Sequence, residues 1–288
     1  MFAKVLVPLD GSELSESVLP WVSFLSDTIK PSPEFLVVRA FEPPGSVYLL
    51  PELAIPTSHI LSDDYLGDTI LNYLDQIKGR LEGLQVDSKM LIGDPASEIL
   101  ELSEKSDLVV MASHGRGGLD KWLMGSVATK VARGIQIPLL VVGSKVAKPA
   151  KNIRIRNILC ALDGSEASER AFETSCSLAK LFGSKLFLYR GVSQVELGDA
   201  LALKTNQEGV RQALESVEAL AAGNSDIETE SKVVETYGRS GIDTYARQIE
   251  ADLICMGSHG KSGFERWMLG SETERTLQTA ECPVLITH

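Results

Sequence analysis

Residues 106–142 read SDLVVMASHGRGGLDKWLMGSVATKVARGIQIPLLVV, and residues 251–287 read ADLICMGSHGKSGFERWMLGSETERTLQTAECPVLIT. In each stretch a short apolar run leads into a glycine-rich loop, a helical pattern and a second apolar run, which predicts strand, loop, helix and strand. The offset between the copies is constant at 145 residues, from Asp107 and Asp252 to Pro138 and Pro283. The loop therefore belongs to a unit that the chain contains twice.

The beginning of each half repeats as well, since VLVPLDGSE at residues 5–13 returns as ILCALDGSE at residues 158–166, an offset of 153. The larger offset indicates about eight extra residues in the first half, and the proline-bearing segment 43–63 is the natural place for them. Its counterpart, near residues 194–207, has no proline. We interpret the chain as a tandem duplication of one α/β domain. The predicted parts are domain 1 at 1–143, a basic linker at 144–156 and domain 2 at 157–288.

The first half alternates apolar strands with helical patterns. This alternation predicts a parallel sheet with helices on both faces, because parallel strands need crossover connections. The two halves are expected to form an internal pseudo-dimer about an approximate two-fold axis. The expected strands before the repeated loop are Lys4–Leu9, Glu34–Phe41 and Leu84–Ile92, and the expected helices are Leu14–Thr28, Asp64–Glu82 and Pro95–Ser106.

The composition favours a soluble globular protein, with 44% hydrophobic and 23% charged residues among 288. A net charge of −11 disfavours a nucleic-acid-binding surface, which needs a basic footprint. No signal peptide is visible, and no apolar stretch approaches the roughly 18 residues that span a bilayer. The four cysteines form no CxxC pair and are expected to be buried, reduced thiols, with a redox role as the alternative. We therefore expect a cytoplasmic protein.

The repeated loop has the composition of an anion-binding site. Ligands of open α/β sheets bind beyond the carboxyl ends of the strands, where Asp10 and the loop after Ala112 should meet. Glycines let the backbone approach a ligand, and a helix that opens at Gly125-Ser126, with Ser126 as the expected N-cap, favours an anion. The alternative is that the glycines serve only a tight connection. The loop matches neither the Walker A pattern nor the dinucleotide fingerprint.

At this point the sequence resembles the universal stress protein family, in tandem. The family signature is Gly-x-x-Gly, nine residues, then Gly-Ser or Gly-Thr. The second half matches it in full, with Gly257, Gly260, Gly270 and Ser271 at these positions. The first half has Ala112 in place of the first glycine. The resemblance covers nearly the whole chain twice and includes the Leu-Asp-Gly-Ser-Glu after the first strand.

The resemblance implies two Rossmann-like domains of the adenine nucleotide alpha hydrolase-like kind, each a five-stranded parallel sheet of order 3-2-1-4-5. It also implies bound ATP, with Mg²⁺ as an option, and dimerisation through the fifth strand, within the chain and as a homodimer option. The implied nucleotide-binding residues of the first half are Asp10, Ala40, Ala112, Gly115, Gly125, Ser126 and Val127. Those of the second half are Asp163, Gly191, Gly257, Gly260, Gly270, Ser271 and Glu272.

Two departures make the halves unequal. Ala112 adds a methyl group in the first half. Glu272 places a carboxylate in the first helical turn of the second half, where it suits the helix dipole but repels a bound phosphate. The half with the complete motif is therefore not necessarily the better binder, and Arg116 and Lys261 could offset phosphate charge or simply face solvent.

The residues of the loop leave three functions open. His114 and His259 are interpreted as loop-packing residues, because a general base needs a partner and a substrate proton within reach. Trp122 and Trp267 are expected to pack the loop or a domain contact, with stacking on a base as the alternative. The favoured function is ATP binding in a stress-response or signalling role with little or no turnover. The alternatives are slow ATP hydrolysis, for which Asp10 and Asp163 are the repeated carboxylates, and an interaction module with vestigial sites.

Overall fold

The computed structural model describes residues 1–42, 64–114, 124–146, 153–193, 200–236, 240–260 and 269–288. Strands of the first half are β1 (Lys4–Pro8), β2 (Glu34–Phe41), β3 (Val86–Ile92), β4 (Leu108–Ala112) and β5 (Leu139–Val142). Strands of the second half are β6 (Asn157–Ala161), β7 (Lys185–Ser193), β8 (Thr229–Thr236), β9 (Leu253–Gly257) and β10 (Val284–Thr287). All of them belong to one sheet of order β3-β2-β1-β4-β5-β10-β9-β6-β7-β8.

Each half is a parallel sheet of order 3-2-1-4-5, which confirms the predicted fold class. The two halves meet where β5 pairs with β10, and this pairing is antiparallel. Its register sets Leu140 opposite Leu285, with Val141 opposite Val284. An antiparallel pairing of equivalent strands is what an approximate two-fold relation between the halves requires. The predicted internal pseudo-dimer is confirmed.

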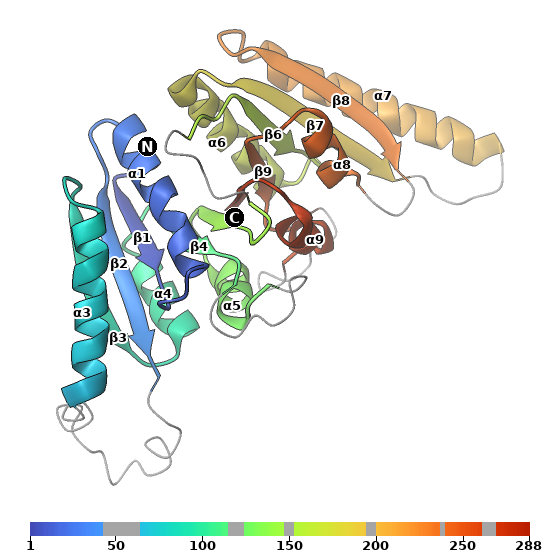
Figure 1. The fold of residues 1–288 in the computed structure, drawn as a ribbon. Helices are drawn as coiled ribbons and strands as arrows, with labels where there is room; N and C mark the ends of the chain where they lie inside the picture. The colour runs from blue at the N-terminus through green and yellow to red at the C-terminus, as the bar shows by residue number, and fades with distance from the viewer. Residues whose placement is uncertain (43–63, 115–123, 147–152, 194–199, 237–239, 261–268) are drawn as a thin grey trace.

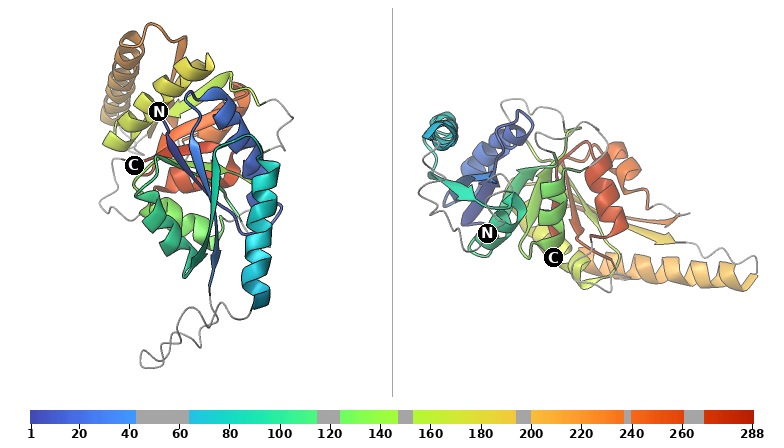
Figure 2. Two further views of the ribbon diagram at one scale, coloured as in Figure 1. Left: turned by 90° about the vertical axis from the view of Figure 1, so that its left-hand side faces the viewer. Right: turned by 90° about the horizontal axis from the view of Figure 1, so that it is seen from below.

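Helices cover both faces of this sheet (Figure 1). One layer contains α1 (Leu19–Thr28), α3 (Asp64–Arg80), α6 (Glu166–Phe182) and α7 (Ala200–Ala222). The other contains α4 (Pro95–Ser103), α5 (Ser126–Gly134), α8 (Ile242–Gln248) and α9 (Ser271–Thr279). Figures 1 and 2 show α3 and α7 at opposite ends of the molecule. Strand residues alternate between the two layers, so that Val5 and Val7 pack on the first and Leu6 on the second.

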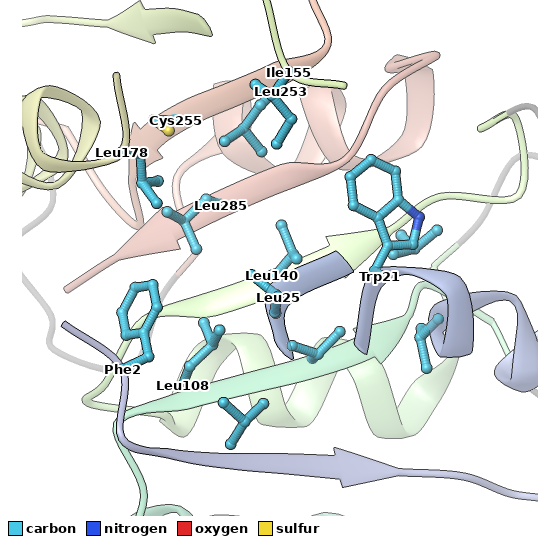
Figure 3. Close-up of a cluster of buried hydrophobic side chains, with 14 of the residues drawn as sticks. Phe2, Trp21, Leu25, Leu108, Leu140, Ile155, Leu178, Leu253, Cys255 and Leu285 are labelled. Atoms are coloured by element: carbon cyan, nitrogen blue, oxygen red, sulfur yellow. The ribbon is translucent and has the colours of Figure 1, made fainter. Parts of the chain in front are cut away.

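The core of the first layer is continuous across the two halves (Figure 3). Leu140 and Leu285 are 6% and 2% exposed and lie on the same side of the paired strands. The rings of Phe24 and Phe182 pack with centroids 5.2 Å apart. Ile155, in the segment expected to be a linker, is buried in the same cluster. The halves therefore share apolar core as well as backbone hydrogen bonds.

The expected helices and strands are present, but several begin or end a few residues from the predicted positions. The helix expected at Leu14–Thr28 begins as a 3₁₀ turn at Ser15–Val18, and α1 follows it. Helices α3 and α4 end a few residues earlier than expected, while β2 has the predicted bounds. The proline-bearing segment 43–63 lies outside the described residues, and residues 200–207 of its counterpart form the start of α7.

The cysteine thiols are free, and three of the four are buried: Cys160, Cys176 and Cys255. Burial raises the pKa of Cys176 to about 11 and that of Cys255 to about 12, so both are protonated at neutral pH. These thiols pack as small apolar groups, as predicted. None of the helices in the described residues has the length and apolar character needed to cross a membrane.

Candidate functional site

The aspartate after the first strand of each half is held by its own loop. Asp10 Oδ1 accepts hydrogen bonds from the Ser12 amide at 2.9 Å and the Ser12 hydroxyl at 2.6 Å. Asp163 Oδ1 accepts from the Ser165 amide at 2.9 Å. Such side-chain-to-backbone turns fix the carboxylate beyond the strand. Both aspartates therefore sit at the carboxyl edge of the sheet, where the topology predicts a ligand.

The loop after the fourth strand closes in the same way in both halves. The Gly125 amide donates to the Ser113 carbonyl at 2.8 Å, and the Gly270 amide donates to the Ser258 carbonyl at 2.8 Å. Gly125 and Gly270 are the N-cap residues of α5 and α9, in extended backbone with no side-chain cap. Ser126, expected as N-cap, is instead the first helical residue, which corrects that prediction. The reason is that the extended backbone lies at Gly125 and Gly270, so that the helical backbone of α5 and α9 begins with the serine.

In the second half this loop approaches the aspartate closely. A Cβ atom placed on Gly260 would lie 2.5 Å from Asp163 Oδ2, so a larger residue here would displace the carboxylate. A Cβ atom on Gly270 would lie 3.3 Å from the Cα atom of His259. The structure thus brings together Asp163, Gly260 and the N-terminus of α9. Three residues of the first half, Gly115, Arg116 and Trp122, lie outside the described residues, as do Lys261 and Trp267 of the second half.

The departure at Ala112 accompanies a local structural difference. A Cβ atom on its counterpart Gly257 would lie 2.9 Å from the carbonyl carbon of Ala167, at the beginning of α6. Ala112 has that methyl group and is buried, with an exposure of 5%. The equivalent helix of the first half starts as the 3₁₀ turn Ser15–Val18 rather than as an α-helix. A buried methyl group and a 3₁₀ start thus occur together in the first half, whereas a glycine and an α-helical start occur together in the second.

The carboxyl-terminal ends of β2 and β7 lie beside the aspartate loops at the same edge of the sheet. The Leu9 amide donates to Val38 and the Leu162 amide to Tyr189, both at 2.8 Å, which ties each aspartate loop to β2 or β7. Ala40 and Gly191 lie two residues farther along these strands. A Cβ atom on Gly191 would lie 3.2 Å from Thr236 Cγ2.

A cavity of about 750 Å³ opens in the second half, between α6, α7 and the ends of β6 and β7. It contains two of the predicted residues, Asp163 and Gly191. The sequence did not indicate its other polar lining, which comes mainly from α6, β7 and α7: Ser168, Glu169, Arg190, Gln212 and Ser216.

Glu272 is engaged by two side chains rather than free in solvent. Its Oε2 atom accepts hydrogen bonds from Arg275, at 2.5 Å, and from the Ser240 hydroxyl. Ser240 in turn accepts a hydrogen bond from the Tyr189 hydroxyl through its carbonyl. The carboxylate therefore connects the first turn of α9 to Ser240, two residues before α8. In the first half, Val127 occupies this position, and the first turn of α5 has no acidic residue.

The two repeated histidines are engaged within their own loops. His114 is 9% exposed, and its Nδ1 lies 2.8 Å from the Ser113 hydroxyl. Burial lowers the pKa of His114, so the ring is neutral at pH 7. His259 Nδ1 lies 2.9 Å from the Ser258 hydroxyl. These contacts support the interpretation of both histidines as loop-packing residues. Among the described residues there is no cluster of three or more metal-ligating side chains.

His288, which follows β10, makes the stability of the fold depend on pH. Burial, with smaller contributions from His259 and Arg170, lowers its pKa to about 4. The folded state therefore resists protonation, and stability is lost as pH falls from the unfolded value of about 6.5 toward 4. We expect the loss of unfolding free energy between pH 7 and 4.5 to be about 2 kcal/mol smaller in His288→Gln. Urea unfolding at both pH values measures this, and an identical loss in the two proteins contradicts it.

Comparison with known proteins agrees with this architecture. The sequence profile described as "Universal stress protein family" matches residues 1–143 and 154–288. Universal stress protein Rv2005c of Mycobacterium tuberculosis is 26% identical over 291 residues, which span 99% of this chain and 96% of the relative. A universal stress protein structure from Archaeoglobus fulgidus matches with a TM-score of 0.71 at 23% identity, covering 99% of this chain and 98% of that one. One from Pseudomonas aeruginosa matches with a TM-score of 0.67 at 18% identity, covering 99% and 93%.

The fold and the duplicated loop define a protein of two tandem α/β units that share one sheet. The chain belongs to the universal stress protein family, with two copies of the family domain. The likeness to the solved structures bears on the fold alone, because their identities are below 25%.

Proposed function

We propose that the chain binds ATP at the carboxyl edge of the first half and acts in stress response or signalling with little or no catalytic turnover. The N-terminus of α5 is the observation that supports this most strongly. The first amides of a helix have no intrahelical partner and carry a partial positive charge, which suits phosphate. The N-cap residue Gly125 provides no side-chain cap for these amides, and no acidic residue lies in the first turn.

The remaining residues of the first half fit the rest of the ligand. Asp10, fixed by Ser12, would accept hydrogen bonds from the nucleoside part, and the backbone at Ala40 would lie beside the base. The phosphates would lie against Gly115, Gly125, Ser126 and Val127. Mg²⁺ would accompany ATP through phosphate oxygens, as it usually does. In the second half, the corresponding set is Asp163, Gly191, Gly257, Gly260, Gly270, Ser271 and Glu272.

Gly125→Asp separates phosphate binding from folding. Gly125 has φ −60° and ψ 152°, which any residue can adopt, and aspartate is a favourable N-cap, so the fold should persist. The new carboxylate opposes the phosphates, and we expect ATP affinity to fall by about tenfold or more. Gly125→Asn has the same shape without the charge and should lose much less. Calorimetric titration measures both; equal losses would contradict an electrostatic role.

Sustained phosphate release distinguishes binding from hydrolysis. We expect ATP to remain intact over many hours with the purified chain, because the histidines of the loop are engaged by serines. Release that persists in purified protein and disappears in Asp10→Ala would favour a slow ATP hydrolase. Absence of ATP binding in the unaltered chain would favour an interaction module with vestigial sites.

A further inference from the structure

The fifth strand of each half has no free side for another chain. Strand β5 lies between β4 and β10, and β10 lies between β5 and β9, so the dimerisation strand implied by the family resemblance is used within one chain. Among the described residues, the outermost strands of the sheet are β3 and β8. We propose that two copies of this chain associate through β3, as an antiparallel strand pair about a two-fold axis at Ser88. This inference does not depend on ATP binding.

The backbone of β3 directs alternate residues away from the sheet. At one end of its pairing with β2, the Phe35 amide donates to the Gln85 carbonyl at 2.8 Å. At the other end, the Gly93 amide donates to the Phe41 carbonyl at 3.0 Å. The register between these strands is constant, so the odd-numbered residues of β3 bond to β2. The N–H and C=O groups of the even-numbered residues therefore point to the free edge: Val86, Ser88, Met90 and Ile92.

The sequence of β3 is complementary to itself in the proposed register. In an antiparallel pair centred on Ser88, the two Ser88 residues face each other and Val86 faces Met90. These residues have outward N–H and C=O groups, so they form the hydrogen-bonded pairs. Asp87 then faces Lys89 of the second copy at the non-hydrogen-bonded positions, where opposite side chains are closest. The two-fold axis produces this charge pair twice.

The same charges exclude the neighbouring registers. A slip that keeps the outward amides paired places Asp87 opposite Asp87, or Lys89 opposite Lys89, and like charges directly opposite are destabilising. The charges of β3 thus favour one register and oppose the registers on either side of it. Complementarity of a surface with itself about one axis is what a closed interface between two identical chains requires.

The two charged side chains of β3 are available to a second copy. Asp87 and Lys89 are exposed, and neither forms an ion pair within the part of the chain that the structure describes. They lie on the face of the sheet that carries α4, because Val86 and Met90, which alternate with them, pack on the α3 side. A partner strand that supplies the opposite charges therefore stabilises both side chains.

Strand β8 repeats the pattern, but its carboxylate is already paired. Residues 230–232 read Glu-Ser-Lys, as 87–89 read Asp-Ser-Lys. Lys185, the first residue of β7, lies 2.9 Å from Glu230. The corresponding first residue of β2 is Glu34, since each precedes the first pair with the edge strand. An acid at this position cannot neutralise Asp87, so β3 is the edge whose charges require a partner.

The mass of the unaltered chain as a function of protein concentration tests the association. The pair contains one short strand from each copy and two charge pairs, so we expect a dimer that dissociates on dilution and is weakened by salt. Sedimentation velocity should show the mass rising from one chain to two. A mass of one chain at the highest soluble concentration would overturn the proposal, and Lys89 would then only protect the edge from aggregation. Growth beyond two chains would overturn the restriction to β3.

Lys89→Glu assigns the association to β3. The new carboxylate faces Asp87 on both sides of the axis, and we expect the dissociation constant of the dimer to rise by about tenfold or more. Lys232→Glu is the matched control, because it makes the same change at the corresponding exposed position of β8 and should leave the dimer intact. Equal effects of the two variants, or loss of the dimer only in Lys232→Glu, would overturn the assignment.

A mixture of two charge variants tests the antiparallel register. Asp87→Lys and Lys89→Glu each place like charges opposite one another in their own dimers, so each variant alone should sediment mainly as single chains. In an equimolar mixture, the two lysines of one chain face the two acids of the other, and we expect dimers to form again with close to the original affinity. Circular dichroism confirms that both variants are folded. Failure of the mixture to dimerise would overturn the pairing centred on Ser88.

Discussion

Replacing Leu285 by alanine is expected to lower the free energy of unfolding of the whole chain by about 2 to 5 kcal/mol. Leu285 is 2% exposed, pairs with Leu140 across the junction of the halves, and packs in the core of Figure 3. Its truncation leaves a cavity in the hydrophobic core that both halves share, rather than in the core of one half. Denaturant unfolding followed by circular dichroism measures the change.

The matched control for this change is Leu71→Ala, because Leu71 is 48% exposed and its truncation should cost less than about 0.5 kcal/mol. Because the junction joins both halves, we expect a single unfolding transition for the whole chain, and its midpoint should move to lower denaturant concentration in Leu285→Ala. Two separate transitions, of which only the one from the second half moves, would contradict a shared core.

Introducing glutamate at Val127 is expected to weaken ATP binding to the first half by about tenfold or more. The substitution copies Glu272 of α9 into the first turn of α5, where no acidic residue lies. A carboxylate at a helix N-terminus favours the helix, so the free energy of unfolding should not fall. The loss is therefore specific to the anionic ligand.

Val127→Gln is the matched control for this change, because it has the same length without the charge. Calorimetric titration of ATP at low and high salt separates the two effects, since screening should reduce the difference between the variants at high salt. Equal losses in Val127→Glu and Val127→Gln, or a difference that does not respond to salt, would indicate a steric cause.

The repeat predicted the duplication, the alternation of strands and helices predicted the parallel sheet, and the family resemblance implied the strand order. The constant offset between the loops fixed the duplication, and the pairing of β5 with β10 confirms the expected role of the fifth strand. Strand β2 was predicted with its observed bounds, because its apolar run is flanked by clear breaks. The start of the first helix was missed because the apolar pattern of the sequence does not distinguish a 3₁₀ turn from the first turn of an α-helix.

The sequence indicated at Ala112 and Glu272 that the two halves differ, but it did not indicate the contacts that accompany the difference. The glycines and aspartates indicated where the loops meet, and the structure places Asp163 against Gly260. Glu272 was singled out as a charge, but its bonds to Ser240 and Arg275 require the packing of α8 against α9. The cavity between α6 and α7 is lined mainly by residues that no motif of the sequence marks.

The number of ATP molecules bound per chain tests the account most directly. Calorimetric titration of the unaltered protein should give one ATP per chain, and the Gly125→Asp variant should lose that site. Two equivalent sites, or one site that survives Gly125→Asp and disappears in Gly270→Asp, would contradict the proposed inequality of the two halves.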